Sequence, residues 1–396
     1  MIDKEESNIT LASNRAGHLE HQKTPKESFH AFVPKPLPPD PALKIDSELQ
    51  NLMGEADRAL GGLNSILILL PNPALFLYMY VRKEALLSSQ IEGTQSSMSD
   101  LLAFESTGAE GVLIDDVKEV SNYIHAMQHG LDRLKGGFPL SQRLIREIHK
   151  ILLTNTRGGD KDPGKFRTSQ NWMGGTRPGN ARFVPPPANE IAHSMGALDK
   201  FLHNDPVHTP LLLKAGLVHA QFETIHPFLD GNGRMGRLLI TFILCAEKAL
   251  SEPLLYLSVH FKQNRDEYYE RLQKVRTHGD WEGWLKFYFE GIRNVSQQAV
   301  DTASKINQLF KRDRERIQEL GKAASSAFAV HELFIEKGVL SVSSATDQLT
   351  ISRPTVSAAV NRLVDLRIVH QMQARKRDKS FLYTEYYSVL MEGAEG

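Results

Sequence analysis

The sequence predicts a mainly α-helical protein that carries one short β-hairpin and ends in a small unit of mixed helices and strands. Apolar residues recur at helical spacing through most of residues 43–320, which is typical of buried or amphipathic helices. Glycine and proline interrupt this pattern over residues 157–190, where only short extended pieces remain. No alternation of strands and helices surrounds the glycine-rich stretch that begins at Gly231, so the sequence does not predict a dinucleotide-binding βαβ fold.

The composition is that of an ordinary globular protein. Of 396 residues, 41% are hydrophobic and 24% are charged, and the length favours two or three domains. The formal net charge is zero, so any binding to nucleic acid would depend on a local basic patch. The single Cys245 excludes an internal disulfide. The N-terminus lacks the charged and then apolar pattern of a secretion signal, so we expect a cytoplasmic protein.

The sequence of the N-terminal region predicts a non-helical arm followed by helices. Residues 1–42 are polar and end in a cluster of prolines, so we expect a poorly ordered arm and then an extended strap. The apolar stretch 60–81 contains Pro71 and Pro73, and its uninterrupted part is too short to cross a membrane. We therefore expect no membrane span but two buried helices joined at these prolines.

The next segment places a carboxylate at an unusual position. Residues 83–92 favour a helix, and Gly93 can end it. Glu92 then lies near a helix C-terminus, where the helix dipole disfavours negative charge. From the local sequence alone, Glu92 is best explained as a solvated acidic residue.

The middle of the chain predicts helices and then a hairpin. Helices are expected over 99–134 and 141–154, with His149 of the second a packed or surface residue rather than a catalyst. Phe166–Met173 and Ala181–Val184 are extended, and the glycine-rich turn between them predicts a β-hairpin. By itself this pattern is also consistent with a surface hairpin without a function.

Helical periodicity returns after the hairpin. Further helical segments are expected over residues 190–203, 211–225, 258–275 and 280–295. The third of these carries Tyr268 and Tyr269, which could stack on a purine or belong to the core.

One stretch of twelve residues combines a base, a carboxylate, three glycines and two arginines: His226-Pro227-Phe228-Leu229-Asp230-Gly231-Asn232-Gly233-Arg234-Met235-Gly236-Arg237. The glycines allow tight turns whose backbone N–H groups form an anion-binding nest, and the apolar residues that follow predict a helix whose N-terminus favours phosphate. Arg234 and Arg237 carry guanidinium groups that suit phosphate oxygens. Asp230 is a hard oxygen ligand that suits Mg²⁺, and His226 has an ordinary pKa that suits a general base near neutral pH.

A competing interpretation uses the helix before this loop. His219, Glu223 and His226 follow one another at spacings of four and three, so they could share one helical face and bind the transition metal of a hydrolase. Pro227 disfavours a helix that continues through His226, and both arginines would be left without a role. The nucleotide site is therefore preferred.

The twelve residues resemble the signature of Fic-domain proteins, His-Pro-Phe-x-Asp/Glu-Gly-Asn-Gly-Arg-x-x-Arg, at every defined position. The resemblance covers roughly residues 60–295 and implies a mostly helical core, a hairpin flap and an activity that moves AMP from ATP to a hydroxyl of a target protein. It implies that His226 is the base and that Asp230 binds Mg²⁺ or Mn²⁺. The nucleotide would be held by the loop and its neighbouring helices, that is by Gly231, Asn232, Gly233, Arg234, Met235, Gly236, Arg237, Gln221 and Tyr269.

Two other segments are similar to parts of the same family. Ser88-x-x-x-Glu92-Gly93 matches its inhibitory motif, Ser/Thr-x-x-x-Glu-Gly/Asn, in which the glutamate pairs with the second arginine of the loop, here Arg237. Its position ahead of the core implies the class with an N-terminal inhibitory helix. The predicted hairpin resembles the family's flap, which implies that a target segment binds along residues 166–187 by strand-like backbone pairing.

Residues 326–396 predict a separate unit that resembles a winged-helix domain. Two helices joined by a short turn and then two wing strands are expected at Val342–Leu349, Arg353–Leu366, Ile368–Gln373 and Phe381–Thr384. The wing tip, 375–379, is basic. Such a unit would bind DNA through residues 353–379, or would serve protein contacts and a homodimer, and the near-neutral composition does not decide between them.

Together these patterns predict an adenylyltransferase that modifies Ser, Thr or Tyr hydroxyls of target proteins and of itself, and that Glu92 inhibits. The second hypothesis is a DNA-binding transcriptional regulator whose Fic core senses a nucleotide. Some members of the family transfer other groups or remove AMP, and the loop does not separate these activities. The expected segments are an N-terminal arm, an inhibitory helical region, a catalytic core, a linking helix and a winged-helix domain, at residues 1–42, 43–135, 136–295, 296–325 and 326–396.

Overall fold

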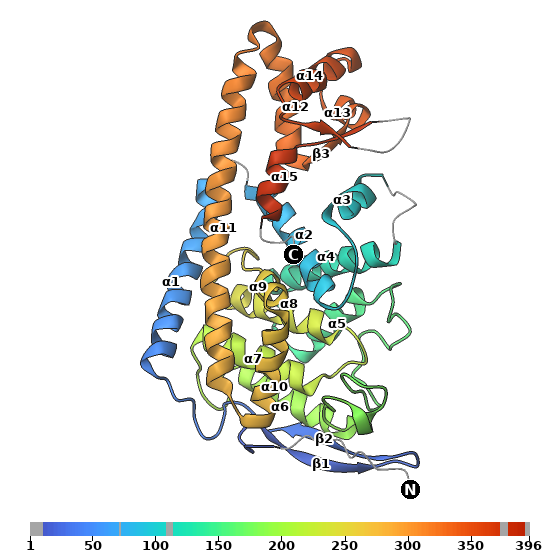
Figure 1. Cartoon of the computed structure of the whole chain (residues 1–396), viewed down its shortest axis with the longest axis vertical. Helices are drawn as coiled ribbons and strands as arrows, with labels where there is room; N and C mark the ends of the chain where they lie inside the picture. The colour runs from blue at the N-terminus through green and yellow to red at the C-terminus, as the bar shows by residue number, and fades with distance from the viewer. Residues whose placement is uncertain (1–10, 71–72, 108–113, 373–378, 393–396) are drawn as a thin grey trace. The chain divides into compact units, whose positions relative to one another are not determined.

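The computed structural model describes residues 11–70, 73–107, 114–372 and 379–392 and confirms a mainly helical chain (Figure 1). The chain divides into two compact units, which comprise Met1–Gly61 with Glu84–Val295 and Gly62–Lys83 with Ser296–Gly396. Three helices carry residues of both units: α1 (Ser47–Leu69), α2 (Pro73–Ile91) and α11 (Trp281–Gln318). The first two are the pair that the prolines predicted, and the helix expected before the C-terminal unit is the second half of α11.

The N-terminal segment contains a β-hairpin, so the prediction of a poorly ordered arm is wrong for its described part. β1 (Gly17–Lys23) and β2 (Ser28–Pro34) pair antiparallel along their whole length. β2 buries Phe29 and Ala31 in a small apolar cluster with Val184. Most residues of β2 are buried, from Phe29 to Pro34, but this short apolar segment stands among polar residues and does not show in the composition of the region.

The helices of the first unit pack around the buried pair α7 (Leu211–Ile225) and α8 (Asn232–Ala246) (Figure 1). α4 (Ile114–Lys135) packs on α8, and α6 (Ile191–Leu202) packs on α7. The remaining helices of this unit are α3 (Met98–Thr107), α5 (Gln142–Leu152), α9 (Ser258–Gln263) and α10 (Arg265–His278). Among the described residues, no helix combines the length and the apolar character that a membrane crossing requires.

Two segments that were each predicted as one helix consist of two helices in the structure. The segment expected over 258–275 is broken at Asn264 into α9 and α10, and the Asn264 side-chain amide donates to the His260 carbonyl oxygen (3.0 Å) at the end of α9. The segment expected over 99–134 consists of α3 and α4, while residues 108–113 between them lie outside the described part of the chain.

The predicted hairpin flap is regular only at its centre. One antiparallel bridge joins Met173 and Phe183, and short 3₁₀ turns lie at Pro178–Asn180 and Ala188–Glu190. The other side of the flap is covered by β2, where the Phe32 N–H donates to the Val184 carbonyl oxygen (2.9 Å). The N-terminal hairpin therefore braces the flap.

The C-terminal part of the second unit contains short helices and a small sheet. Its elements are a 3₁₀ turn (Gly321–Ala323), α12 (Ala324–Lys337), β3 (Val339–Ser341), α13 (Val342–Gln348), α14 (Arg353–Asp365), β4 (His370–Gln371), β5 (Ser380–Leu382) and α15 (Thr384–Met391). The strands are antiparallel in the order β3-β5-β4. β3 and α15 were not predicted, and the tip 373–378 lies outside the described residues.

Candidate active site

The loop between α7 and α8 is closed by its own side chains. His226 ends α7 in the left-handed region at φ 50°, and Gly231 takes φ 75° before α8 begins. The Asn232 side chain spans the turn, because its Oδ1 accepts from the Phe228 N–H (2.9 Å) and its Nδ2 donates to the Phe228 carbonyl oxygen (2.8 Å). Asn232 was predicted to hold phosphate. Because both polar atoms of its side chain bond to the Phe228 backbone, only the backbone N–H of Asn232 is left for that role.

A second support for the loop comes from α5. The His149 ring stacks on Phe228 with centroids 3.6 Å apart. Its Nδ1 accepts from the Gly164 N–H (2.9 Å), so Nε2 carries the proton and donates to the Asp230 carbonyl oxygen (2.9 Å). Burial lowers the pKa of His149 to about 4, which keeps this neutral form. Of the two structural roles that its helix left open, packed or surface, His149 has the packed one, and it fixes the backbone beside Asp230.

His226 combines a fixed backbone with a buried imidazole. Arg167 donates its Nε–H to the His226 carbonyl oxygen (2.9 Å), while the buried Nδ1 of His226 has no hydrogen-bond partner among the described residues. Burial, assisted by the nearby positive charges of Arg276 and Arg167, lowers the pKa of His226 to about 3. The imidazole is therefore neutral at ordinary pH and is able to accept a proton.

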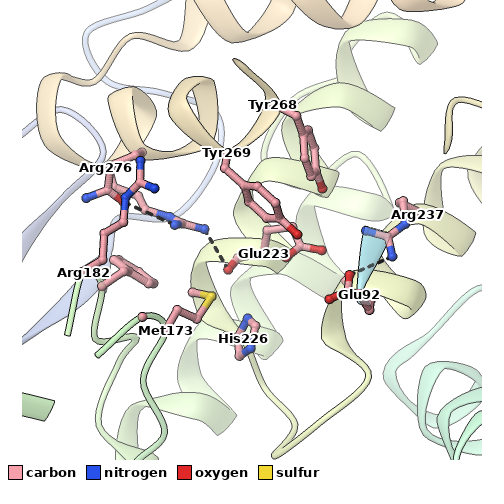
Figure 2. Close-up of a pocket in the computed structure, with 13 residues that line it drawn as sticks. Glu92, Met173, Arg182, Glu223, His226, Arg237, Tyr268, Tyr269 and Arg276 are labelled. Carbon is pink, nitrogen blue, oxygen red and sulfur yellow. Dashed lines mark hydrogen bonds and ion pairs between the residues drawn. The ribbon is translucent and has the colours of Figure 1, made fainter. Parts of the chain in front are cut away.

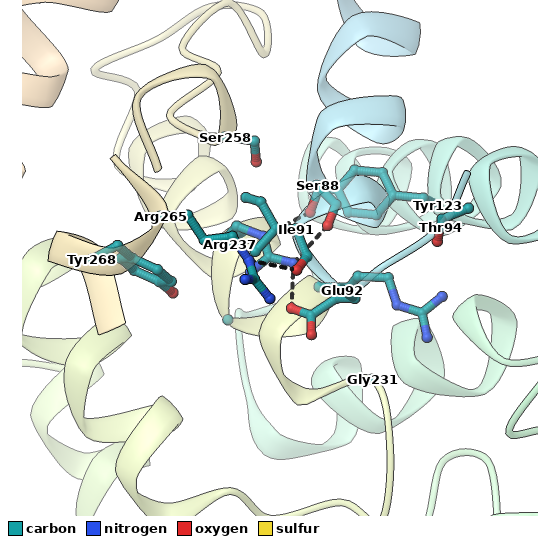
Figure 3. A network of polar contacts seen from close by, with 12 residues as sticks. Ser88, Ile91, Glu92, Thr94, Tyr123, Gly231, Arg237, Ser258, Arg265 and Tyr268 are labelled. Atoms are coloured by element: carbon teal, nitrogen blue, oxygen red, sulfur yellow. Dashed lines mark hydrogen bonds and ion pairs between the residues drawn. The ribbon is translucent and has the colours of Figure 1, made fainter. Parts of the chain in front are cut away.

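Arg237 is held by Ser88 on the last turn of α2 and by Glu92, which directly follows that helix (Figure 3). Its Nε–H donates to Ser88 Oγ, and one terminal nitrogen donates to both the Ser88 carbonyl oxygen and Glu92 Oε1, each at 2.8 Å. The Arg237 side chain is 2% exposed, whereas that of Glu92 is 34% exposed. Burial opposes ionisation of Glu92, but the adjacent guanidinium outweighs it and holds the pKa of Glu92 below its usual value.

The end of α2 is anchored independently of this ion pair. Glu84 lies two turns before Glu92 and is buried, where it accepts hydrogen bonds from Tyr123 of α4 (3.0 Å) and from the Ser258 hydroxyl (2.6 Å). Arg265 donates to the carbonyl oxygen of the last residue of α2 (3.3 Å). The position of Glu92 beside the loop is thus set by the packing of α2.

Arg234 has a partner that the sequence did not indicate. It is buried and pairs with Glu119 of α4, 3.2 Å from nitrogen to oxygen, while Glu119 also accepts from the Thr94 hydroxyl (3.3 Å). Asp230 lies 3.8 Å from Arg234 and keeps 41% of its side chain exposed. The accessible carboxylate of Asp230, just before the N-terminus of α8, fits Mg²⁺, which retains several waters and uses few protein ligands.

A pocket with a volume of about 390 Å³ opens beside the loop (Figure 2). It is lined by residues from the loop, the flap, α7, α8, α10 and the end of α2: Glu92, Met173, Gly174, Arg182, Phe183, Glu223, His226, Gly233, Arg237, Tyr268, Tyr269, Gln273 and Arg276. The structure thus brings together the predicted base, the second loop arginine, the predicted inhibitory glutamate and Tyr269. The flap contributes as the resemblance implied, whereas the sequence did not assign Glu223 or the far end of α10, with Gln273 and Arg276, to a nucleotide pocket.

The two tyrosines have different surroundings. Tyr268 is buried, and its hydroxyl donates to His219 Nε2 (2.9 Å), so most of it belongs to the core. Tyr269 lies beside it at the pocket, with Arg265 over its ring, and burial raises its pKa to about 12. A neutral ring at this position suits stacking on a base.

Two other predicted site residues serve a structural purpose. Gln221 donates its amide to the Lys35 carbonyl oxygen (2.8 Å), so it holds the strap that follows β2 and does not line the pocket. Met235 is fully buried. Both positions lie on buried helices, where the sequence pattern does not say which neighbour a side chain meets.

The competing metal site is not formed. His219 uses both ring nitrogens, since Nδ1 donates to the Gly236 carbonyl oxygen (2.8 Å) and Nε2 accepts from Tyr268. Neither nitrogen is left to bind zinc together with Glu223 and His226. Within residues 11–70, 73–107, 114–372 and 379–392, no group of three His, Cys, Asp or Glu side chains is arranged to hold a metal.

Comparisons with known proteins agree with this architecture. Residues 50–132 match the Fic/DOC family N-terminal domain, and residues 139–244 match the Fic/DOC family domain. The chain therefore contains a Fic/DOC family N-terminal domain and a Fic/DOC family domain over these residues.

Its relatives include proteins named for an activity. The protein adenylyltransferase Fic of Drosophila willistoni is 28% identical over 264 residues, which are 63% of this chain and 48% of the relative. That of Nematostella vectensis is 29% identical over 180 residues, which are 45% and 38% of the two chains. This chain thus spans less than half the length of each of these two relatives.

Solved structures share the fold. A Fic family protein from Desulfovibrio desulfuricans G20 superposes with a TM-score of 0.58 at 22% identity, over 86% of this chain and 97% of that one. A Fic domain containing signaling protein from Bacteroides thetaiotaomicron has a TM-score of 0.50 at 19% identity, over 65% and 97%. At these identities the likeness concerns the fold.

Proposed function

We propose that this chain is a protein adenylyltransferase that moves AMP from ATP to a Ser, Thr or Tyr hydroxyl of target proteins and of itself. The observation that carries the proposal is the neutral imidazole of His226, which lines a pocket together with Arg237 and the N-terminal residues of α8. A base, a buried cation and a helix N-terminus are what transfer of a nucleotide to a hydroxyl requires. The match to the Fic/DOC family and the names of the relatives support the same activity.

In the proposed reaction, His226 takes the proton of the target hydroxyl. The hydroxyl oxygen attacks the α-phosphorus, the bond from that phosphorus to the oxygen bridging to the β-phosphate breaks, and pyrophosphate leaves with the bond electrons. The backbone of Gly231–Gly236 and the two loop arginines would hold the phosphates. Asp230 would bind a divalent cation, which supplies charge neutralisation to the phosphates. Most of the catalysis is then positioning and charge stabilisation.

We further propose that the Glu92 contact keeps the enzyme inactive. Arg237 donates to Ser88 and Glu92 at 2.8 Å, so in this arrangement it is not free to bind the terminal phosphate of ATP. An ATP bound without this arginine would not present its α-phosphate to the hydroxyl. Release of Glu92 would let Arg237 turn to the nucleotide.

The test is incubation of the purified chain with Mg²⁺ and ATP labelled at the α-phosphate, with and without a cell lysate. Label should appear in the chain itself and in a small set of lysate proteins, and it should be absent when the label is at the γ-phosphate. A parallel series with GTP, CTP and UTP identifies the transferred group. Absence of protein labelling by Glu92→Gly, the variant expected to be active, would contradict the proposal.

The C-terminal elements support a second candidate function, in DNA binding. α13 and α14 follow one another as in a helix-turn-helix, and Ser352 caps α14 by accepting from the Thr355 N–H. The buried face of α14 contains Val356 and Leu363, while Arg353 is exposed at its start. We propose that this exposed face binds duplex DNA. Titration of a mixed-sequence duplex at several salt concentrations tests it, since contacts to phosphate weaken steeply as salt rises.

A further inference from the structure

A buried carboxyl group lies in the pocket beside the proposed base. Glu223 is on the last turn of α7, three residues before His226, which caps that helix, and both residues line the pocket. It is 6% exposed and lines the pocket (Figure 2). Its Oε1 is buried and accepts no hydrogen bond from any residue in the described part of the chain.

The side chain is not explained by a structural role. A buried carboxyl group is ordinarily held by hydrogen bonds, as Glu84 is by Tyr123 and Ser258 in the same unit. The structural contact of Glu223 is made by its backbone instead, since its carbonyl oxygen accepts a hydrogen bond from Arg276 (3.1 Å). Gly236 of α8 packs directly against Oε1, since a methyl group at this glycine would lie 2.5 Å from that atom. The carboxyl group is thus enclosed on the helix side and directed at the pocket.

The charges that face Glu223 come from every neighbouring element. Arg237 of α8 and Arg276 of α10 favour its ionised form, whereas Glu92 at the end of α2 disfavours it. Tyr268 and Tyr269 of α10 and Arg182 of the flap line the same pocket. Burial dominates this balance and raises the pKa of Glu223 to about 7.

We propose that Glu223 contacts the nucleotide as a neutral carboxylic acid and donates its O–H to an oxygen of the ligand's sugar and phosphate portion. A negatively charged ligand next to a carboxylate is repelled, and in a pocket sheltered from water the carboxylate avoids this by taking up a proton from solvent. The neutral acid then offers a hydrogen-bond donor to the pocket that its carboxyl group lines. No bond of the ligand changes in this step. The inference rests on the proposed nucleotide site and names a residue that helps to bind there.

The proposal has a defined dependence on pH. The form that binds is the neutral one, so affinity is full below the pKa of the free protein and is lost as the pH rises through it. The dissociation constant should therefore rise by up to about tenfold for each pH unit above about 7, and binding at pH 8 should take up close to one proton. Glu92 and His226 have pKa values well below this window and do not contribute.

The experiment is titration calorimetry of the full chain with Mg²⁺ and the α,β-methylene analogue of ATP, which cannot transfer AMP. Measurements at pH 6, 7 and 8, in two buffers that differ in ionisation enthalpy, give both the affinity and the protons taken up. Glu223→Gln keeps a donor of the same shape and cannot titrate. It should bind like the wild type at pH 6 and about tenfold more tightly than the wild type at pH 8, without the extra proton. The titration of the ligand itself is common to both proteins and cancels in the comparison.

Two further variants complete the design. Glu223→Leu removes the donor and should weaken binding at every pH. Glu270→Gln removes an exposed carboxylate of α10 that pairs with Lys274 and should behave like the wild type. Equal affinity and equal proton uptake for the wild type and Glu223→Gln would overturn this inference alone. Absence of binding in all four proteins would overturn the proposed nucleotide site and this inference with it.

Discussion

The arginines of the loop and those of the C-terminal helix α14 have the same side chain in opposite surroundings. Arg234 and Arg237 are each 3% exposed and form ion pairs with Glu119 and Glu92. Arg353 is exposed at the start of α14. A buried guanidinium needs a permanent partner, because leaving it unpaired is costly, whereas an exposed one is solvated by water and screened by salt.

This difference indicates which arginines would discriminate between ligands and which would bind charged partners in general. In the loop, both arginines are paired with carboxylates, and a ligand that recruits Arg237 would have to replace Glu92. On α14, an arginine is free to meet many partners, so its contribution is general and small. The predictions below test this contrast between buried and exposed groups in order of expected effect.

Replacement of His226 by alanine should have the largest effect on activity. A general base contributes roughly 10²–10⁴-fold to a rate, so labelling should fall by that factor in a Glu92→Gly background, while binding of Mg²⁺ and ATP and the melting temperature stay close to their parent values. His193→Ala provides the exposed counterpart on α6 and should change nothing. Activity within a few-fold of the parent would remove His226 from its role.

Loss of the partner of Arg234 should be the most damaging change to stability. Glu119→Ala removes the nearest carboxylate of the buried Arg234 guanidinium, and breaking a buried ion pair in this way costs about 3–5 kcal/mol. The matched surface change, Arg353→Ala, should alter the free energy of unfolding by less than about 0.5 kcal/mol. Chemical denaturation of both variants measures the difference. Similar losses in the free energy of unfolding for the two variants would show that burial does not make the contacts of Arg234 more important for stability than those of Arg353.

Release of Arg237 should activate the enzyme. Glu92→Gly removes a charge-assisted hydrogen bond, worth about 1.5–3 kcal/mol, which corresponds to a rise in self-modification of about ten- to a hundredfold. Glu92→Asp should give a smaller rise, because its shorter side chain still approaches Arg237. The double variant Glu92→Gly with Arg237→Ala should not be hyperactive. A folded Glu92→Gly protein with unchanged or lower transfer would show that this contact is not inhibitory.

Removal of the exposed arginine of α14 should have a modest effect on DNA binding. Arg353→Ala should weaken binding to all duplex sequences alike and reduce the slope of affinity against salt by about one. AMP transfer should be unaffected, which a labelling assay on the same preparation checks. Absence of DNA binding by the parent protein would instead support a role of this face in protein contacts.

The smallest change is expected in the response of the maximal rate to pH. Because burial lowers the pKa of His226 to about 3, the imidazole stays neutral and able to accept a proton from pH 8 down to pH 5.5. The rate of the Glu92→Gly protein at saturating ATP should therefore be nearly constant over this range. A loss of rate with a midpoint near 6.5, the pKa of an exposed histidine, would show that His226 is solvated in the active state.

The sequence alone predicted much of the helical fold and the position of the loop from His226 to Arg237. Helical periodicity predicted α5, α6 and α7 with nearly their observed bounds, because the burial of one helical face is a local pattern. The twelve residues from His226 to Arg237 were identified together because they are contiguous. The Glu92–Arg237 pair was predicted as well, although its two members are 145 residues apart, since each belongs to a recognisable motif.

Only the tertiary structure decided which partner each side chain meets. Glu119 shows no distinguishing feature on its helix, yet it pairs with Arg234; Gln221 lies on the helix that leads to the loop, yet it holds the strap after β2. Glu223 entered the sequence interpretation only as a metal ligand, and its meaning changed once His219 was found to be fully bonded to Gly236 and Tyr268. Helical periodicity predicts which face of a helix is buried. The pKa of a side chain on that face depends on the charges and hydrogen bonds of its neighbours, which are distant in sequence and adjacent only in the folded chain.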